Sequence, residues 1–284
     1  MANFWSGILF RIAKHWIAGE TCDEALARAE QSNGHNVRGI INLLGEDATI
    51  REETEDATHE YVKILNEIHS RNIRSCISIK PTQLGLAIDK TLCKSHLESI
   101  VGTAKSFGSF VWIDMESSGH TYDTINLYLG LLRKFDNVGL AIQAYLRRSE
   151  DDVNRIVDNG GTIRLCKGSY NERPDIVYKR RKEIDKSYSK LMRIIFERSR
   201  GFAIATHDEK LIEEACKLGS IHHADFEFEM LMGIRDKKKI QLVDRGYRVS
   251  EYIPFGKRWW AYSVRRIREH KSNIFLLARS LVSG

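Results

Sequence analysis

The sequence predicts an α/β fold in which eight parallel strands close into a barrel. Short β-rich runs recur along the 284 residues and alternate with amphipathic helical patterns, for example over 54–72 and 208–219. Strands that alternate with helices in this way are typically parallel and joined by crossover helices. The β-rich runs span residues 37–44, 73–79, 109–115, 138–146, 161–166, 201–206, 221–228 and 247–253.

The other common α/β architecture, a doubly wound open sheet, agrees less well with the sequence. Such a sheet usually has fewer strands and often carries a glycine-rich phosphate loop after the first of them. Residues 42–47 (NLLGED) follow the first run and do not form such a loop. Neither GxGxxG nor GxxxxGK[ST] occurs anywhere in the chain. The barrel is therefore the preferred prediction.

Residues 4–17 (FWSGILFRIAKHWI) precede the first strand and have the pattern of an amphipathic helix. Arg11, Lys14 and His15 interrupt the apolar run, which is too short and too charged to cross a bilayer or to act as a signal peptide. Two interpretations stay open: the helix packs on the protein's own surface, or it contacts a membrane or a partner. We assign residues 1–35 to an N-terminal helical segment and 36–284 to the barrel domain.

Residues 259–269 (WWAYSVRRIRE), after the last β-rich run, predict a final helix of about three turns. Tyr262, Arg265, Arg266 and Glu269 are spaced by three and four residues, so they share one face of that helix. Either this face is solvated and stabilised by an Arg265–Glu269 ion pair, or it turns inward over the barrel mouth and binds a ligand.

The charge balance of the chain is compatible with several partners. There are 44 basic and 38 acidic residues, a net charge of +6, and the two kinds interleave. An anionic ligand, nucleic acid or anionic lipid would each suit that balance. Basic runs at 178–186 and 235–239 are typical of exposed helix faces. The five cysteines show no CxxC spacing, which predicts a reducing, cytoplasmic location without disulfides or a zinc site.

Polar residues cluster at the ends of the β-rich runs. In a barrel these positions meet at one mouth, where the active sites of such folds lie. The cations among them are Lys80, Arg164 and Lys167, and the final helix adds Arg265 and Arg266, so we expect a ligand with carboxylate or phosphate groups. The other residues of the cluster are Glu46, Asp114, Glu116, Gln143, Tyr145, Gly168, Tyr170, Thr206, His207, Asp208, Glu227, Glu229 and Tyr252.

Nine motifs, in the order of the strand ends, resemble the proline dehydrogenase family, which also occurs as a domain of bifunctional proline-utilisation flavoenzymes. The resemblance covers residues 36–272. It implies a distorted (β/α)8 barrel that binds FAD noncovalently. The implied reaction is oxidation of L-proline to Δ1-pyrroline-5-carboxylate, with hydride passing from proline C5 to flavin N5 as the first step of proline degradation to glutamate. The motifs are LLGE (43–46), SIKPTQLG (78–85), IDME (113–116), IQAYLRR (142–148), RLCKGSY (164–170), ATHD (205–208), FEFEMLMG (226–233), YIPFG (252–256) and RRIRE (265–269).

The resemblance also implies roles for individual residues in binding proline. Arg265, Arg266 and Lys80 hold the proline carboxylate, since guanidinium groups present paired donors and an ammonium adds a compact charge. The wall around the pyrrolidine ring is formed by Tyr145, Tyr170, Leu231, Tyr252 and Tyr262.

Near the flavin, the resemblance places Arg164 beside N5, where a cation stabilises the anionic reduced flavin. Asp114 either orients Arg164 and Lys80, influences the amine proton, or forms only a salt bridge at the barrel rim. Thr206 and His207 begin a helix that Asp208 caps, either with or without a bound pyrophosphate. The implied FAD contacts are Met115 through its backbone, Gln143, Lys167, Gly168, Ser169, Thr206, His207 and Glu269.

Three positions depart from the family pattern. Pro81 follows Lys80 where leucine is usual, Glu229 replaces a common glutamine, and Asn171 follows Tyr170 where bifunctional relatives often have tryptophan. The last two changes put the flavin environment in question.

The implied partners are a quinone as electron acceptor and, because the chain ends without an aldehyde dehydrogenase half, a separate pyrroline-5-carboxylate dehydrogenase. Two other functions compete with this prediction. The first is a flavin-free aldolase or phosphosugar barrel in which Lys80 or Lys167 forms a Schiff base. The second is a basic nucleic-acid-binding module, for which the sequence has no recognised motif. The location is cytoplasmic, with the inner face of the membrane as the alternative if residues 4–17 bind lipid.

Overall fold

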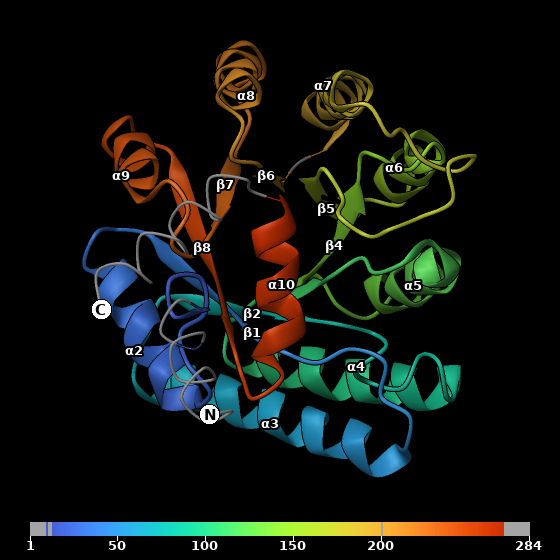
Figure 1. Cartoon of the computed structure of the whole chain (residues 1–284), viewed down its shortest axis with the longest axis vertical. Helices are drawn as coiled ribbons and strands as arrows, with labels where there is room; N and C mark the ends of the chain where they lie inside the picture. Colours follow the sequence, from blue (N-terminus) through green and yellow to red (C-terminus); the bar gives the residue numbers. More distant parts are fainter. Residues whose placement is uncertain (1–9, 11–12, 200, 270–284) are drawn as a thin grey trace, which may run out of the picture.

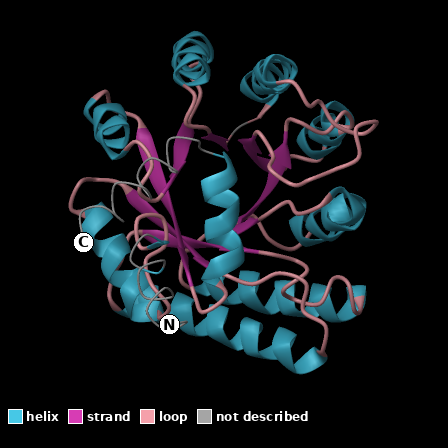
Figure 2. Ribbon diagram, viewed as in Figure 1, coloured by secondary structure: helices cyan, strands magenta, loops and turns pink. Residues whose placement is uncertain are grey.

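A computed structural model describes residues 10, 13–199 and 201–269 and contains the expected closed barrel. Eight parallel strands pair in chain order, and β8 closes the ring against β1 (Figures 1 and 2). Each strand overlaps one of the β-rich runs, which confirms the predicted fold class. The strands are β1 (Arg38–Leu43), β2 (Ser75–Ile79), β3 (Val111–Ile113), β4 (Val138–Gln143), β5 (Thr162–Cys166), β6 (Phe202–Ala205), β7 (Phe226–Leu231) and β8 (Arg248–Phe255).

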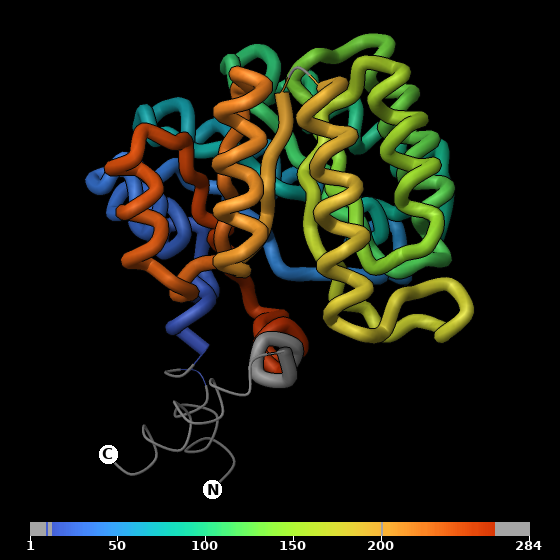
Figure 3. The backbone as a smooth tube through the Cα atoms, turned by 90° about the horizontal axis from the view of Figure 1, so that it is seen from above, coloured from blue at the N-terminus to red at the C-terminus, as the bar shows by residue number. Residues whose placement is uncertain are grey.

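Helices α3 to α9 surround the barrel, one after each of the strands β1 to β7 (Figure 2). The helix that follows β8, α10 (Trp259–Glu269), crosses the open end of the barrel, as Figure 1 shows. In the view of Figure 3 it lies beyond the ends of α7 and α8, so it covers the mouth and not the wall. The surrounding helices are α3 (Arg51–Ser70), α4 (Lys90–Ser106), α5 (Ser118–Leu132), α6 (Ser149–Asp158), α7 (Arg181–Arg198), α8 (Glu209–His222) and α9 (Asp236–Asp244).

The predicted start of the seventh strand is wrong. Its run was placed at 221–228, whereas β7 begins at Phe226. Ile221 belongs to the last turn of α8 and is 69% exposed, and the helix ends where His223 adopts a left-handed backbone conformation. An apolar residue in a helical last turn resembles a strand residue locally. Because β7 continues to Leu231, Glu227 and Glu229 lie within it and do not follow it.

Helix α2 (Cys22–Asn33) covers the wall between β1 and β8, where a helix after β8 would otherwise pack. The buried carboxylate of Glu251 on β8 anchors α2 to the barrel: it accepts hydrogen bonds from Arg28 Nε and Ser32 Oγ of α2, at 2.8 Å each. The same carboxylate accepts a hydrogen bond from Lys239 of α9. Because Lys239 is only 3% exposed, the expectation that 235–239 is an exposed face is wrong at this residue.

The barrel interior has an apolar layer on which the site is built. Ile40, Trp112 and Ala203 form this buried cluster, and Cys76 packs against it. Alternate residues of a strand face the same side. The positions two residues further along these strands therefore also face inward, one layer nearer the mouth, and they are Asn42, Ser78, Asp114 and Ala205.

The described part of residues 4–17 packs on the protein itself. Trp16 and Ile17 are buried against Leu44 and against Tyr262 of α10. Of the two interpretations of this segment, this one is favoured for residues 13–17, while residues 4–9, 11 and 12 lie outside the described residues. No helix within the described ranges is long and apolar enough to cross a membrane.

Candidate active site

The ends of the strands surround a cavity of about 630 Å³ at the mouth that α10 crosses. Every strand, or the residue directly after it, contributes to the lining. The predicted convergence of the strand ends on one site is therefore confirmed. The eight contributions, in strand order, are Asn42, Lys80, Asp114, Gln143, Arg164, Ala205, Glu229 and Tyr252.

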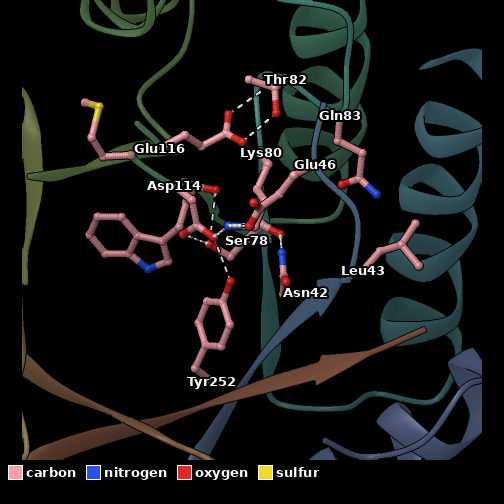
Figure 4. Close-up of polar contacts among 12 residues, drawn as sticks. Asn42, Leu43, Glu46, Ser78, Lys80, Thr82, Gln83, Asp114, Glu116 and Tyr252 are labelled. Carbon is pink, nitrogen blue, oxygen red and sulfur yellow. Dashed lines mark hydrogen bonds and ion pairs between the residues drawn. The ribbon is translucent and has the colours of Figure 1, made fainter. Parts of the chain in front are cut away.

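Asp114, directly after β3, is the centre of a buried hydrogen-bond network (Figure 4). Its Oδ1 accepts from Ser78 Oγ at 2.7 Å and from Arg164 Nη1 at 2.9 Å. Its Oδ2 accepts from Tyr252 Oη at 2.6 Å and from Lys80 Nζ at 3.3 Å. Burial raises the pKa of Asp114, but Lys80 and Arg164 outweigh burial, and the net pKa is lowered. Asp114 is therefore an ionised carboxylate at neutral pH.

Lys80, directly after β2, stands between two carboxylates. Its Nζ lies 3.3 Å from Asp114 Oδ2 and 3.6 Å from Glu46 Oε1. Burial lowers the pKa of Lys80, but the surrounding charges, Asp114 first, raise it well above its usual 10.5. The residue therefore carries a positive charge in the cavity wall.

The guanidinium of Arg164, inside β5, is held on two edges and one face. Nη1 donates to Asp114 and to Ser78 Oγ, both at 2.9 Å. Nε forms an ion pair with Glu229 of β7, and the Trp112 ring lies 4.5 Å from Cζ. Arg164 is only 4% exposed, yet Nη2 has no hydrogen-bond partner among the residues that the structure describes.

Three further buried atoms of the cavity wall lack a hydrogen-bond partner in the described part of the chain. Gln143 Nε2 donates to the Met115 carbonyl at 2.9 Å, but Gln143 Oε1 accepts nothing there. The same holds for Oδ1 of Asn42 and Oε1 of Glu229. A buried polar group without a partner costs about 1–3 kcal/mol. The wall therefore suits a ligand that both donates and accepts hydrogen bonds.

The side of the cavity toward α7 and α8 is a charged cluster. Lys167 Nζ lies 2.5 Å from Asp185 Oδ1 and 3.1 Å from Asp208 Oδ2, and Arg181 Nη2 lies 2.8 Å from the same Asp208 oxygen. Burial raises the pKa of Asp208, but Arg181 and Lys167 outweigh it and lower the pKa to about 2. Lys167 thus has two protein counter-ions in this structure.

The helix start that follows β6 has the predicted cap. Asp208 Oδ1 accepts from Lys210 N–H at 3.1 Å, and Thr206 Oγ1 accepts from Asp208 N–H at 3.1 Å. The His207 ring nitrogen Nε2 accepts from Leu231 N–H at 2.9 Å, which joins this segment to β7. Thr206, His207 and Leu231 all line the cavity, as expected.

Gly168 allows the loop after β5 to pass close to the cavity. Its φ is +96°, and a Cβ there would lie 2.1 Å from the Tyr145 ring, so only glycine fits. Gly168 and the exposed Ser169 line the cavity, as does Tyr170, whose hydroxyl donates to Glu46 at 3.4 Å.

From α10, Tyr262 lines the cavity and is 8% exposed, so the face of the helix that carries it turns inward. Trp260, on another face, is 54% exposed. The backbone of Arg265, Arg266 and Glu269 belongs to α10, while their side chains lie outside the described part of the chain.

Several residues of the site escaped the sequence prediction, namely Asn42, Ser78, Trp112, Arg181, Asp185 and Ala205. Ser78 and Trp112 lie two residues before Lys80 and Asp114, so the strand period of two could have found them. Asp185 lies in the charged run 178–186, which resembles an ordinary exposed helix face.

Comparison with known proteins gives consistent matches. The family described as "Proline dehydrogenase" matches residues 25–278. Proline dehydrogenase 1 of Bacillus subtilis (strain 168) is 30% identical over 273 residues, which cover 95% of this chain and 90% of that protein. Proline dehydrogenase of Deinococcus radiodurans is 29% identical over 284 residues, covering 97% and 92%. The crystal structure of proline utilization A from Bdellovibrio bacteriovorus, inactivated by N-propargylglycine, has a TM-score of 0.83 at 25% identity; the match covers 90% of this chain but only 32% of that one.

Proposed function

Because the chain belongs to the proline dehydrogenase family, oxidoreductases that act on the CH–NH bond of proline, we propose that it catalyses the FAD-dependent oxidation of L-proline to Δ1-pyrroline-5-carboxylate. The observation that carries the proposal is the wall around Asp114. It presents two cations, Lys80 and Arg164, together with four polar atoms that have no partner among the described residues, to one cavity. Such a wall suits a small carboxylate next to a planar ring with donors and acceptors on its edge.

The proline carboxylate is bound between Lys80 and α10. Tyr262 faces the cavity, and residues three and four positions later share its helical face. Arg265 and Arg266 occupy those positions. Each guanidinium presents paired N–H donors to a carboxylate, and the ammonium of Lys80 adds a third charge.

The unpartnered atoms fit the flavin of FAD. Gln143 Oε1 suits an N–H of the isoalloxazine edge, and Arg164 Nη2 suits an acceptor atom of the same ring. Lys167 and the free N–H groups at the start of α8 suit the pyrophosphate. The backbone of Met115, Gly168 and Ser169, the segment at Thr206 and His207, and the side chain of Glu269 complete the proposed contacts. When bound, FAD supplies the two-electron oxidant by accepting hydride at N5.

The chain's own residues bind the substrate, orient it and exclude water. Tyr252 and Leu231 pack against the pyrrolidine ring, and α10 covers the mouth, which strengthens the charge interactions beneath it. For Asp114 the orienting role is favoured over proton transfer. Both of its oxygens already accept two hydrogen bonds, and its lowered pKa makes it a weak base.

The Schiff-base alternative is disfavoured by the ionisation of Lys80. A Schiff-base lysine attacks as the neutral amine, so its pKa must fall toward neutrality. The pKa of Lys80 is instead raised, chiefly by Asp114 against the effect of burial. Lys167 Nζ is held between Asp185 and Asp208, so this side chain is engaged in an ion-pair cluster and is not free to attack a carbonyl carbon.

We further propose that residues 36–284 form the catalytic unit, that the electrons pass to a quinone, and that a separate pyrroline-5-carboxylate dehydrogenase consumes the product. Family resemblance is the support for the acceptor and for the partner. A cytoplasmic location and a peripheral membrane contact through the segment before residue 13 belong to the same proposal.

The test is the visible spectrum of the purified protein before and after anaerobic L-proline, with D-proline as the control. We expect the two visible flavin bands, and we expect them to bleach with L-proline alone. A protein that stays colourless after incubation with FAD would reject the flavin site. A yellow protein that L-proline does not bleach would reject proline as the substrate.

A further inference from the structure

A second buried carboxylate, which the proposed reaction does not use, lies against Arg164. Glu229 is in the middle of β7, lines the cavity and is 3% exposed. Its Oε2 pairs with Nε of Arg164, and its Oε1 has no hydrogen-bond partner within the described residues. Its charge on the cavity wall therefore acts directly on this guanidinium.

Glu229 and Asp114 hold different edges of the Arg164 guanidinium. Asp114 and Ser78 engage Nη1, Glu229 engages Nε, and Trp112 covers one face. Asp114 alone does not fix the orientation of the guanidinium, because its carboxylate also binds Lys80 and Tyr252. With Glu229 in place, the guanidinium cannot rotate in its plane, and Nη2 is the nitrogen left to donate into the cavity.

We propose that Glu229 is a positioning residue that acts on the cofactor through Arg164: it aims Nη2 at the flavin and offsets part of the guanidinium charge. This inference rests on the proposed FAD site. A cation near the flavin stabilises the anionic reduced form and raises the reduction potential. A carboxylate in contact with that cation weakens the effect, so a neutral side chain at position 229 should raise the potential.

The extent to which Glu229 offsets the charge of Arg164 depends on the ionisation of Glu229. Burial raises its pKa to about 8, Arg164 opposes this rise, and Glu227 and Asp114 add to it. The offset is therefore small at about pH 6, where the carboxyl is largely protonated, and grows toward about pH 10.

Most other titratable groups around Glu229 keep their charge over that interval. Burial raises the pKa of Cys166 on β5 to about 12 and raises the pKa values of Cys76 on β2, Tyr188 on α7 and Tyr252 on β8 further above their usual range. Asp114, directly after β3, stays ionised. His207, after β6, contacts the backbone of Leu231, and a comparison of variants at each pH removes its contribution.

The experiment is a spectroelectrochemical titration of bound FAD between about pH 6 and about pH 10, in the wild type and in Glu229→Gln. The amide keeps the size of the side chain and an acceptor for Arg164 Nε, but it removes the charge. At the alkaline end, the ratio of reduced to oxidised flavin at a fixed potential should be on the order of tenfold higher in the variant than in the wild type. For a two-electron couple this corresponds to a reduction potential that is about 30 mV higher. The difference should vanish toward the acidic end.

Glu227→Gln is the matched control. It makes the same charge change on the same strand, but Glu227 Oε2 accepts from Ser250 Oγ at 2.9 Å, and the structure records no contact with Arg164. At the alkaline end, where Glu229 is ionised in both proteins, we expect a shift much smaller than that of Glu229→Gln. Near pH 8 the control should lower the potential slightly, because loss of the Glu227 charge lowers the pKa of Glu229 and lets its carboxylate form at a lower pH. If the amide variant does not fold, Glu229→Leu replaces it, with a smaller expected rise, because leucine also removes the contact that aims Nη2.

The possible outcomes separate this inference from the proposed function. An unchanged potential in Glu229→Gln at every pH overturns the inference, even if thermal stability falls, since a purely structural role moves stability alone. Equal shifts in the Glu229 and Glu227 variants also overturn it, because the effect would then be one of general charge. A protein that binds no FAD refutes both the cofactor proposal and this extension of it.

Discussion

Replacing Asp114 with asparagine should destabilise the protein by about 3 kcal/mol. The substitution keeps the shape of the side chain and removes the charge that four hydrogen-bond donors share. Removing one partner of a buried ion pair typically costs about 3–5 kcal/mol. The lower end applies here, because Lys80 keeps Glu46 at 3.6 Å and Arg164 keeps Glu229.

The measurement is urea unfolding of the cofactor-free protein, with the free energy of unfolding extrapolated to water. The matched control is Asp136→Asn, the same substitution in a surface ion pair with Lys105 at 3.0 Å, for which we expect no measurable change. The pKa of Asp114 is lowered below its usual 3.8 in the folded protein. Its contribution is therefore complete above that value and is lost as the pH falls through the folded pKa.

A double-mutant cycle with Lys80→Met sharpens the test. If the Asp114–Lys80 pair at 3.3 Å is a real interaction, the two substitutions together should cost less than the sum of their separate effects, with a coupling on the order of 1–3 kcal/mol. An Asp114→Asn protein that unfolds at the same urea concentration as the control would refute the reasoning, since the buried charges would then need no counter-ion.

Five further substitutions test the residues in and around the site. Arg265→Ala and Arg266→Ala should each lower kcat/KM for proline roughly 30- to 1,000-fold, on the order of 2–4 kcal/mol, with FAD still bound; wild-type kinetics in both would assign these residues to a solvated face. Arg164→Met should lower the flavin potential and slow reduction by proline, and a potentiometric titration without a shift would exclude its role beside the flavin. Tyr262→Ser should narrow the preference for L-proline over trans-4-hydroxy-L-proline, which the phenol sets at about 1–3 kcal/mol by crowding the hydroxyl; an unchanged ratio of kcat/KM values would leave Tyr262 as packing alone. Burial raises the pKa of Glu116 from 4.5 to about 7, so the folded state binds more protons than the unfolded state between these values, and stability falls as the pH rises through them. In Glu116→Gln, the decrease in the free energy of unfolding between these pH values should be smaller than in the wild type by about 3 kcal/mol. Urea unfolding at several pH values measures it, and a profile identical to that of the wild type would contradict the prediction.

Much of the architecture follows from local patterns in the sequence. Strand and helix periods differ, so eight β-rich runs could be counted and their parallel order inferred without coordinates. The mouth followed from the same count, because the carboxyl ends of parallel strands lie at one end of a barrel. Lys80 and Asp114 follow their strands directly, and their convergence was therefore predictable.

Interactions within the mouth could not be predicted in the same way. Arg164 pairs with Glu229 across β6, and Asp114 joins residues of β2, β5 and β8. These contacts depend on strand register and on the depth at which each side chain enters the barrel. The start of β7 was misjudged because the last turn of α8 contains an apolar residue. Its end was also placed too early, at 228, so Glu229 was expected after the strand, whereas β7 extends to Leu231.

Burial of charge is the other feature that required the folded molecule. Lys239 lies in a run of basic residues that is typical of an exposed helix, yet it is buried against Glu251, which also receives Arg28 from a helix more than 200 residues earlier in the chain. Residue type and spacing determine which elements form and which way they face. Whether a charged side chain finds its counter-ion in the interior depends on two distant segments arriving at the same place, because the cost of removing a charge from water is offset only by that contact.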